Sequence, residues 1–367
     1  MRFVRTDELK TGLRIARPIY NKKGVLLYEA GSSLTSQAIA SISNFGLIGI
    51  FVLDATEPVP PMSEDDIEFE RFKTVKVYEI MGEFKDIIAT HRVHKLSNIC
   101  NDILVKYGHM RRKLNFMQDI RSKEDYVYKH TLNVSILATL MLFHMSVSQA
   151  EKEEILQACM IHDFGKVTVP DILLDGEDPD ELDRILNNAQ ETGLDMVDTL
   201  FPSNPNIKRI CSQSFNMRMS IIMGREPDRM KVLTGTRILN VADTYDTLTS
   251  ISTTGGREPM SGIAALRYLY KYPEIFNKKA VEALVLSVDL LPQGTSVLLS
   301  NGSQALVLSV NYNDILKPMV LEFSTNRIMD LASPEYSDIE IDDVVKTMDS
   351  RHVLSKEQMA QFGIKSS

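Results

Sequence analysis

The stretch "CMIHDFGKVTVPDILL" at residues 159–174 decides how this chain is interpreted. It places an adjacent His162-Asp163 pair at the end of an apolar helical pattern, followed after Phe164 by Gly165 and Lys166. A neutral imidazole and a carboxylate are both good ligands for a divalent metal ion. A His-Asp dipeptide is also common by chance, so a histidine at a solvent-exposed helix end is the simpler interpretation when the pair is considered alone.

Two apolar segments outside this stretch carry further candidate residues. "VYKHTLNVSILATLMLFHM" at 127–145 predicts a buried helix that bears His130, and "RILNVADTYDTLTS" at 237–250 predicts a helix interrupted by Asp243 and Asp246. A histidine on a packed neighbouring helix could face His162, and a buried carboxylate needs a partner. Taken alone, His130 is more often an ordinary core or boundary histidine, and Asp243 is more often a helix-capping or salt-bridged aspartate.

The remaining chain predicts a mainly α fold with small β-rich segments at both ends. Apolar residues recur at three- and four-residue steps over much of 66–290, which is typical of helices packed on one face. Asn301-Gly302 between two apolar runs is a strong hairpin signal. The expected parts are a β-rich N-terminal module (1–57), a linker with connecting helices (58–123), a helical domain (124–290), a C-terminal β segment (291–347) and a tail (348–367).

Composition and charge exclude several classes of protein. Among 367 residues, 41 Lys and Arg stand against 49 Asp and Glu, and the net charge of −8 argues against a DNA- or RNA-binding surface. The three cysteines are far apart and form no CxxC motif. The sequence shows no signal peptide and no apolar run long enough to span a membrane, so we expect a cytoplasmic protein.

The order His130, His162-Asp163, Asp243 resembles the HD superfamily of metal-dependent phosphohydrolases, and more closely the HD-GYP family, whose characterised members hydrolyse cyclic di-GMP. The resemblance covers about 126–290 and implies an HD-type helical bundle for that part of the chain. It implies that His130, His162, Asp163 and Asp243 are metal ligands for Fe or Mn. It also implies that Asp163 and Lys166 act in catalysis, with Lys166 offering its positive charge to a substrate phosphate.

The chain also departs from the family pattern. The family has a further His-Pro pair where this chain has Ala189-Gln190, and an adjacent His-His-Glu near Gln213. No histidine falls between residues 163 and 351, and the Gly-Tyr-Pro loop is missing. Arg257 in "REPMS" is a partial match to a family arginine segment and is the second predicted substrate-binding residue beside Lys166. At most one metal ion is therefore expected, and a site that binds no metal stays open as an alternative.

Three hypotheses of function remain open. The first is a degenerate HD-GYP-like protein in bacterial cyclic-dinucleotide signalling, with weak or no activity, that senses a nucleotide or binds a signalling protein. The second is an active phosphodiesterase that hydrolyses cyclic di-GMP or another nucleotide at a single-metal site. The third is a structural scaffold in which the His-Asp pair has no present function. The sequence leaves the oligomeric state open.

Overall fold

The computed structural model describes residues 2–45, 47, 49–53, 59, 62–121, 125–170, 178–226, 231–252, 259–311 and 314–345. The chain divides into two compact units, and each is treated by itself. One unit is helical and comprises residues 72–288. The other comprises residues 1–71 together with the segment that follows residue 288, and it holds an N-terminal β module and a C-terminal sheet.

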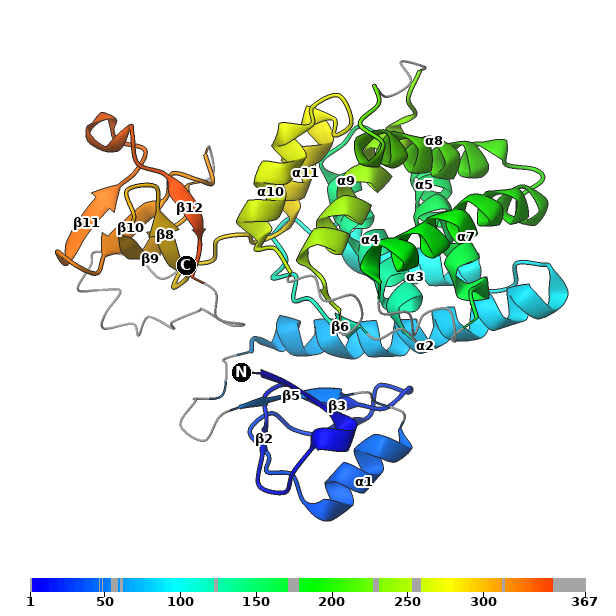
Figure 1. The fold of residues 1–367 in the computed structure, drawn as a ribbon, viewed down its shortest axis with the longest axis horizontal. Helices are drawn as coiled ribbons and strands as arrows, with labels where there is room; N and C mark the ends of the chain where they lie inside the picture. The colour runs from blue at the N-terminus through cyan, green and yellow to red at the C-terminus, as the bar shows by residue number, and fades with distance from the viewer. Residues whose placement is uncertain are drawn as a thin grey trace. The chain divides into compact units, whose positions relative to one another are not determined.

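The helical unit is built almost entirely from α-helices, which Figure 1 shows gathered around a central pair, α4 and α9. Its elements are α2 (Glu64–Thr90, whose first turns belong to the other unit), α3 (Leu96–Tyr107), β6 (Ile120–Arg121), α4 (Tyr126–Phe143), α5 (Gln149–Ile161), η2 (Phe164–Thr168), α7 (Pro179–Leu200), α8 (Pro205–Ile222), α9 (Thr234–Thr249), β7 (Ile251–Ser252), α10 (Gly262–Lys271) and α11 (Lys278–Ser287).

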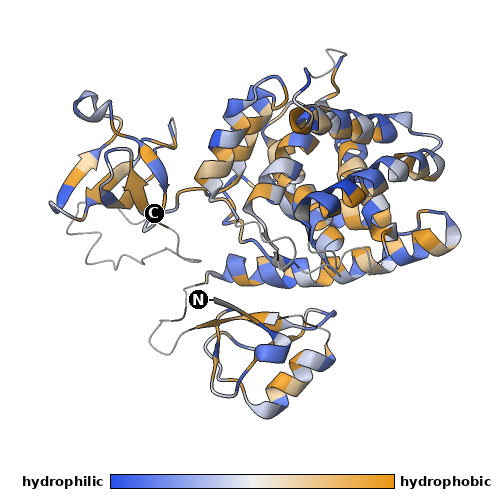
Figure 2. Ribbon diagram, in the orientation of Figure 1, coloured by the Kyte–Doolittle hydropathy of each residue, from blue (hydrophilic) through white to orange (hydrophobic). Residues whose placement is uncertain are grey.

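Helix α4 is the central element of this unit, because it is buried on every side. Every residue from His130 to Leu142 is buried, and the helix packs against α3, α5, α9 and α11. A helix that is hydrophobic all round belongs inside a core. Helix α2 instead carries both hydrophobic and hydrophilic residues along its length (Figure 2), as expected of a helix with one solvated face.

A short parallel pair joins two segments that are far apart in the sequence. Ile120 and Arg121 of β6 pair with Ile251 and Ser252 of β7. This pairing follows directly after α9, so it fixes the backbone of Arg121 beside the C-terminal end of that helix. The pair therefore brings a residue from before α4 to the polar interior between α4 and α9.

The N-terminal module is a small sheet with one helix. Its elements are β1 (Arg2–Arg5), η1 (Thr6–Glu8), β2 (Arg14–Ile15), β3 (Ile19–Tyr20), β4 (Leu26–Tyr28), α1 (Ser36–Asn44) and β5 (Gly49–Leu53). The strands β1, β5 and β2 form an antiparallel sheet, while β3 and β4 form a hairpin. The core of the module includes Ile15, Ile42 and Val52.

The C-terminal sheet confirms the predicted hairpin. Its elements are β8 (Ser296–Leu299), β9 (Gln304–Ser309), β10 (Met319–Glu322), β11 (Arg327–Asp330), η3 (Pro334–Tyr336) and β12 (Ile341–Val344), in the spatial order β11-β10-β9-β8-β12. Gly302, between β8 and β9, has a φ of 82°, which is the left-handed conformation that Asn-Gly turns require.

The predicted fold class, mainly α with small β-rich segments near both ends, is confirmed. The finer domain boundaries stay a prediction, since the contacts between Cα atoms divide the chain into two units and not into the five predicted parts. Among the described helices, none is both long and apolar enough to cross a lipid bilayer.

Candidate metal centre

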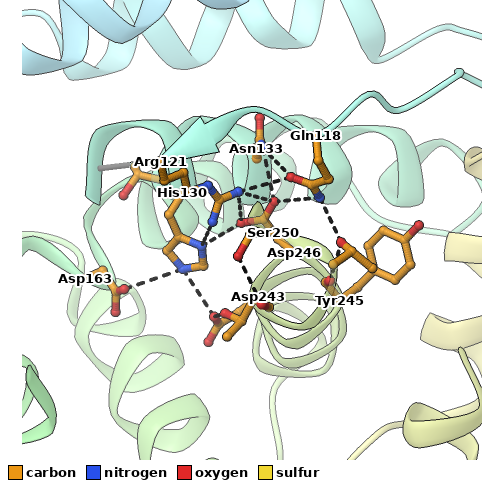
Figure 3. A network of polar contacts seen from close by, with 12 residues as sticks. Gln118, Arg121, His130, Asn133, Asp163, Asp243, Tyr245, Asp246 and Ser250 are labelled. Carbon is orange, nitrogen blue, oxygen red and sulfur yellow. Dashed lines mark hydrogen bonds and ion pairs between the residues drawn. The ribbon is translucent and has the colours of Figure 1, made fainter. Parts of the chain in front are cut away.

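His130 of α4 lies at the centre of a buried polar network between α4 and α9 (Figure 3). Its Nδ1 is 2.7 Å from Oδ2 of Asp246, one helical turn beyond Asp243 on α9. Both residues are fully buried, His130 at 1% exposure and Asp246 at 0%. The bond places a proton on Nδ1 and turns Nε2 toward the opposite side, which is the arrangement in which a carboxylate orients a metal-binding histidine.

Asp246 is itself held by three side chains that converge on it (Figure 3). Arg121 lies 2.6 Å away through Nη2, Asn133 donates from Nδ2 at 3.1 Å, and Gln118 donates from Nε2 at 3.2 Å. Arg121 is fully buried, so its charge has to be balanced within the protein. Asp246 therefore supports His130 from a rigid, charge-balanced position.

His162 and Asp163 lie where α5 ends and the short helix η2 begins. His162 is the residue that caps the C-terminus of α5, and its Nδ1 is 2.7 Å from the backbone oxygen of Cys159 in the last turn. A backbone carbonyl can only accept a hydrogen bond, so Nδ1 carries the proton and Nε2 offers its lone pair. The end of α5 thus sets the tautomer of His162 without any other side chain.

A close contact between η2 and α7 fixes the position of this segment. A Cβ atom built on Gly165 would lie 2.0 Å from the backbone oxygen of Ala189, and one built on Gly193 would lie 2.6 Å from the Cα of Gly165. Only glycine allows two backbones to approach this closely. The crossing of Gly165 and Gly193 therefore anchors the residues that follow Asp163.

The donor atoms of three predicted ligands converge at one point. One donor atom each from His130, His162 and Asp163 lies within 4.8 Å of the other two, and all three residues are buried. The two Nε2 atoms are 3.3 Å apart, and Asp163 lies 3.4 Å from His130 through Oδ2 and 3.6 Å from His162 through Oδ1. Nitrogen and oxygen ligands about 2.1 Å from a metal ion lie roughly 3–3.5 Å from one another.

An unsatisfied oxygen supports the fit of this set to a metal ion. Oδ1 of Asp163 is buried and forms no hydrogen bond within the described part of the chain. Burying a carboxylate oxygen without such a bond is costly. Two neutral imidazoles and a carboxylate are suitable ligands for iron, manganese or zinc. The residues present therefore fit a single divalent metal ion.

Asp243 of α9 lies next to this set of donor atoms. Its Oδ1 is 3.2 Å from Nε2 of His130, but it is not part of the group whose donor atoms all lie within 4.8 Å. Its other oxygen, Oδ2, is 2.6 Å from Nη1 of Arg218 on α8. The structure thus brings all four predicted ligands together around His130, and their role in binding a metal stays a prediction.

Each carboxylate of the site has a cation at contact distance. Lys166 is 2.6 Å from Asp163, Arg218 is 2.6 Å from Asp243, and Arg121 is 2.6 Å from Asp246. Burial raises the pKa of a carboxyl group, but here these cations outweigh burial. They lower the pKa of Asp163 and hold that of Asp243 well below its usual range, while Arg121 lowers the pKa of Asp246 to about 2.

The two histidines differ in charge. Burial would lower the pKa of His130, but hydrogen bonds to Asp243 and Asp246 raise it to about 10. Burial lowers the pKa of His162, and its neighbour Asp163 only partly offsets that effect. Without a metal ion, His130 therefore carries a proton on both nitrogens while His162 is neutral. A metal ion at this site would replace the proton on Nε2 of His130.

The residues at the positions where the resemblance implies further histidines make other contacts here. Gln190 on α7 is buried, and its Oε1 accepts a hydrogen bond from Nη2 of Arg218. Gln213 on α8 accepts hydrogen bonds from the backbone N–H of Leu233 and the hydroxyl of Thr236, at the start of α9. Gln213 therefore stabilises the start of a helix. Arg257, the second predicted substrate-binding residue, lies outside the described residues.

The sequence patterns do not assign Arg121, Arg218 or Gln190 to the site. They place Asp246 beside Asp243, one turn further along the same apolar helix, but give it no role as the partner of His130. Arg218 is a single charge among methionines in "FNMRMS", which is a weak signal. Arg121 gives no local signal, since the pairing of β6 with β7 alone brings it to Asp246.

Comparisons with known proteins show what this chain is similar to. Residues 127–248, which include all four predicted ligands, match the family model described as the HD domain. The chain is 22% identical over 212 residues to a curated cyclic di-GMP phosphodiesterase of Pseudomonas aeruginosa. That match covers 57% of this chain and 50% of the relative, so the chain spans about half the length of that protein.

A solved structure described as an "HDG'Y'P" protein from Bdellovibrio bacteriovorus is also similar. It is 12% identical, and the superposition covers 77% of this chain and 97% of the other with a TM-score of 0.40.

Proposed function

From the premise that this chain belongs to the HD-GYP family of HD-domain proteins, we propose that it binds cyclic di-GMP or a related nucleotide with little or no hydrolysis. It would then act as a sensor or interaction module in bacterial cyclic-dinucleotide signalling. The observation that carries this proposal is the pairing of Asp243 with Arg218. Because Asp243 is paired with Arg218, the mutually close donor atoms for a metal ion are those of His130, His162 and Asp163.

The chemistry of such a set is limited. A bound divalent ion would polarise a phosphodiester oxygen and lower the pKa of a water molecule. His130 and His162 would hold that ion through Nε2, each with its tautomer set by a hydrogen bond at Nδ1. Efficient phosphodiester hydrolysis gains from a second ion that stabilises the leaving oxygen. The described residues offer no second group of three mutually close metal ligands, which favours slow or absent turnover.

Lys166 is proposed to contact the phosphate of the bound nucleotide. Its ammonium group is 2.6 Å from Asp163, and its side chain is 9% exposed. An ammonium group is a point charge with three donors, so it can bind a carboxylate and a phosphate oxygen at the same time. Lys166 would therefore connect the nucleotide to the His162-Asp163 pair.

A second candidate function is an active phosphodiesterase that uses one metal ion. The unsatisfied Oδ1 of Asp163 and the two oriented imidazoles favour it, because they fit a bound ion. We propose iron or manganese as that ion, with at most one per chain. The two candidates share the site and differ in the rate of turnover.

Purified protein distinguishes the two candidates through its metal content, its binding of cyclic di-GMP and its turnover in excess Mn²⁺. Our proposal expects at most one metal ion per chain and nucleotide binding without turnover. Robust turnover that is lost in His162→Ala and kept in His109→Ala, a change at an exposed histidine, would favour the second candidate. A protein that neither binds nor hydrolyses cyclic di-GMP or a related cyclic dinucleotide would contradict both.

A further inference from the structure

Arg218 connects three helices at the edge of the metal-donor set. It lies on α8, its Nη1 is 2.6 Å from Oδ2 of Asp243 on α9, and its Nη2 donates to Oε1 of Gln190 on α7. Gln190 in turn donates from Nε2 to the backbone oxygen of His162 at 3.4 Å. The guanidinium group is therefore held on two sides by groups that are themselves buried.

This contact uses the carboxylate that would otherwise complete the donor set. Asp243 lies 3.2 Å from Nε2 of His130 through Oδ1, yet it is not within the mutually close group formed by His130, His162 and Asp163. The side chain of Asp243 is 3% exposed, so its negative charge requires a partner. Arg218 supplies that partner as a permanent cation, because a guanidinium group keeps its charge at any pH of interest.

A lysine or an arginine lies next to each carboxylate of the site before any metal ion binds. Asp163, Asp243 and Asp246 each have one such side chain at 2.6 Å. A divalent ion that enters this site adds two positive charges next to three existing ones. Repulsion between like charges at such short range weakens binding of the ion.

We propose that Arg218 is a built-in competitor of the metal ion: it holds the carboxylate of Asp243 and so restricts the site to one weakly bound divalent cation. The inference rests on the proposed metal site, and it assigns to Arg218 a positioning role through Asp243. Gln190 contributes by holding the second nitrogen of the guanidinium group in place. Removal of the guanidinium group frees Asp243 to become a fourth ligand and removes one opposing charge.

The test is titration of the metal-free full chain with Mn²⁺, followed by calorimetry and by electron paramagnetic resonance. Compared with the unchanged chain, Arg218→Met is expected to bind Mn²⁺ roughly tenfold more tightly or more, since the ion gains a carboxylate and loses a repelling charge. Arg218→Lys keeps the positive charge and is expected to bind as the unchanged chain does. Arg209→Met is the matched control, because Arg209 is an exposed arginine on the same helix.

The outcomes separate this inference from the proposed function. Equal or weaker Mn²⁺ binding by Arg218→Met, or two Mn²⁺ ions bound tightly by the unchanged chain, would overturn the role of Arg218. Folding of Arg218→Met only when Mn²⁺ is present would support it, because the ion then replaces the guanidinium group. An Arg218→Met chain that stays unfolded even with Mn²⁺ would contradict it. Binding of cyclic di-GMP, measured separately, tests the proposed function whichever of these results is obtained.

Discussion

Asp246 is the residue on which the orientation of His130 depends. Asp246→Asn keeps the size of the side chain but removes the charge that balances the fully buried Arg121. Leaving a buried charge without its partner costs about 3–5 kcal/mol, so we expect the free energy of unfolding to fall by about that amount. Loss of the carboxylate behind a ligating histidine is also expected to weaken Mn²⁺ binding about 10–100-fold.

Urea denaturation followed by circular dichroism measures the first effect, and titration with Mn²⁺ measures the second. Asp195→Asn serves as the control, because the side chain of Asp195 is 89% exposed. If Asp246→Asn unfolds at the same urea concentration as this control, the network around Asp246 does not stabilise the protein. Unchanged Mn²⁺ affinity would show that Asp246 does not orient His130.

Among the elements, the crossing of η2 over α7 holds the His162-Asp163 segment in position. Gly193→Ala would place a methyl group 2.6 Å from the backbone of Gly165, and neither backbone can yield cheaply. Overpacking of this kind costs about 1–3 kcal/mol, so the midpoint of thermal unfolding should fall. Because Asp163 precedes this crossing, the affinity for Mn²⁺ should fall as well.

Helix α2 offers a matched control for that change. A Cβ on Gly82 would meet no atom within 4 Å, so Gly82→Ala adds helix propensity without a clash. We expect it to stabilise the protein by about 0.5–1 kcal/mol. Thermal unfolding of both variants checks the pair: equal shifts, or a stabilised Gly193→Ala, would show that the two backbones can separate without cost.

For the whole molecule, the division into two units predicts that the site is self-contained. All residues of the site, from Gln118 to Asp246, lie in the unit that comprises 72–288. We expect a fragment of residues 62–291, which keeps α2 intact, to fold and to bind Mn²⁺ within about threefold of the full chain. The reason is that the contacts described above for the site residues all lie within that unit. Circular dichroism and Mn²⁺ titration check this expectation. An unfolded fragment, or one without Mn²⁺ binding, would show that the site needs the other unit.

Local patterns in the sequence determine most of the elements. The apolar runs before His162 and around His130 form α5 and α4, and the turn at Asn301-Gly302 forms the hairpin of β8 and β9. These elements depend on residues close together in the chain, namely the period of the apolar positions and the conformation of single turn residues. The mainly α fold class could therefore be anticipated from local patterns, whereas the grouping of His130, His162, Asp163 and Asp243 is implied by the resemblance to the HD-GYP family.

Only the tertiary structure decides which charges meet at the site. Asp163 pairs with Lys166, only three residues away in the sequence. Asp243 pairs with Arg218, which is 25 positions away, and Asp246 pairs with Arg121, which is 125 positions away. No local pattern links such distant residues. The structure shows that the four predicted ligands share one buried place, and also that Arg218 already holds one of them. The physical reason is that a buried carboxylate requires a cation as its partner, while the packing of the helices alone determines which cation lies next to it.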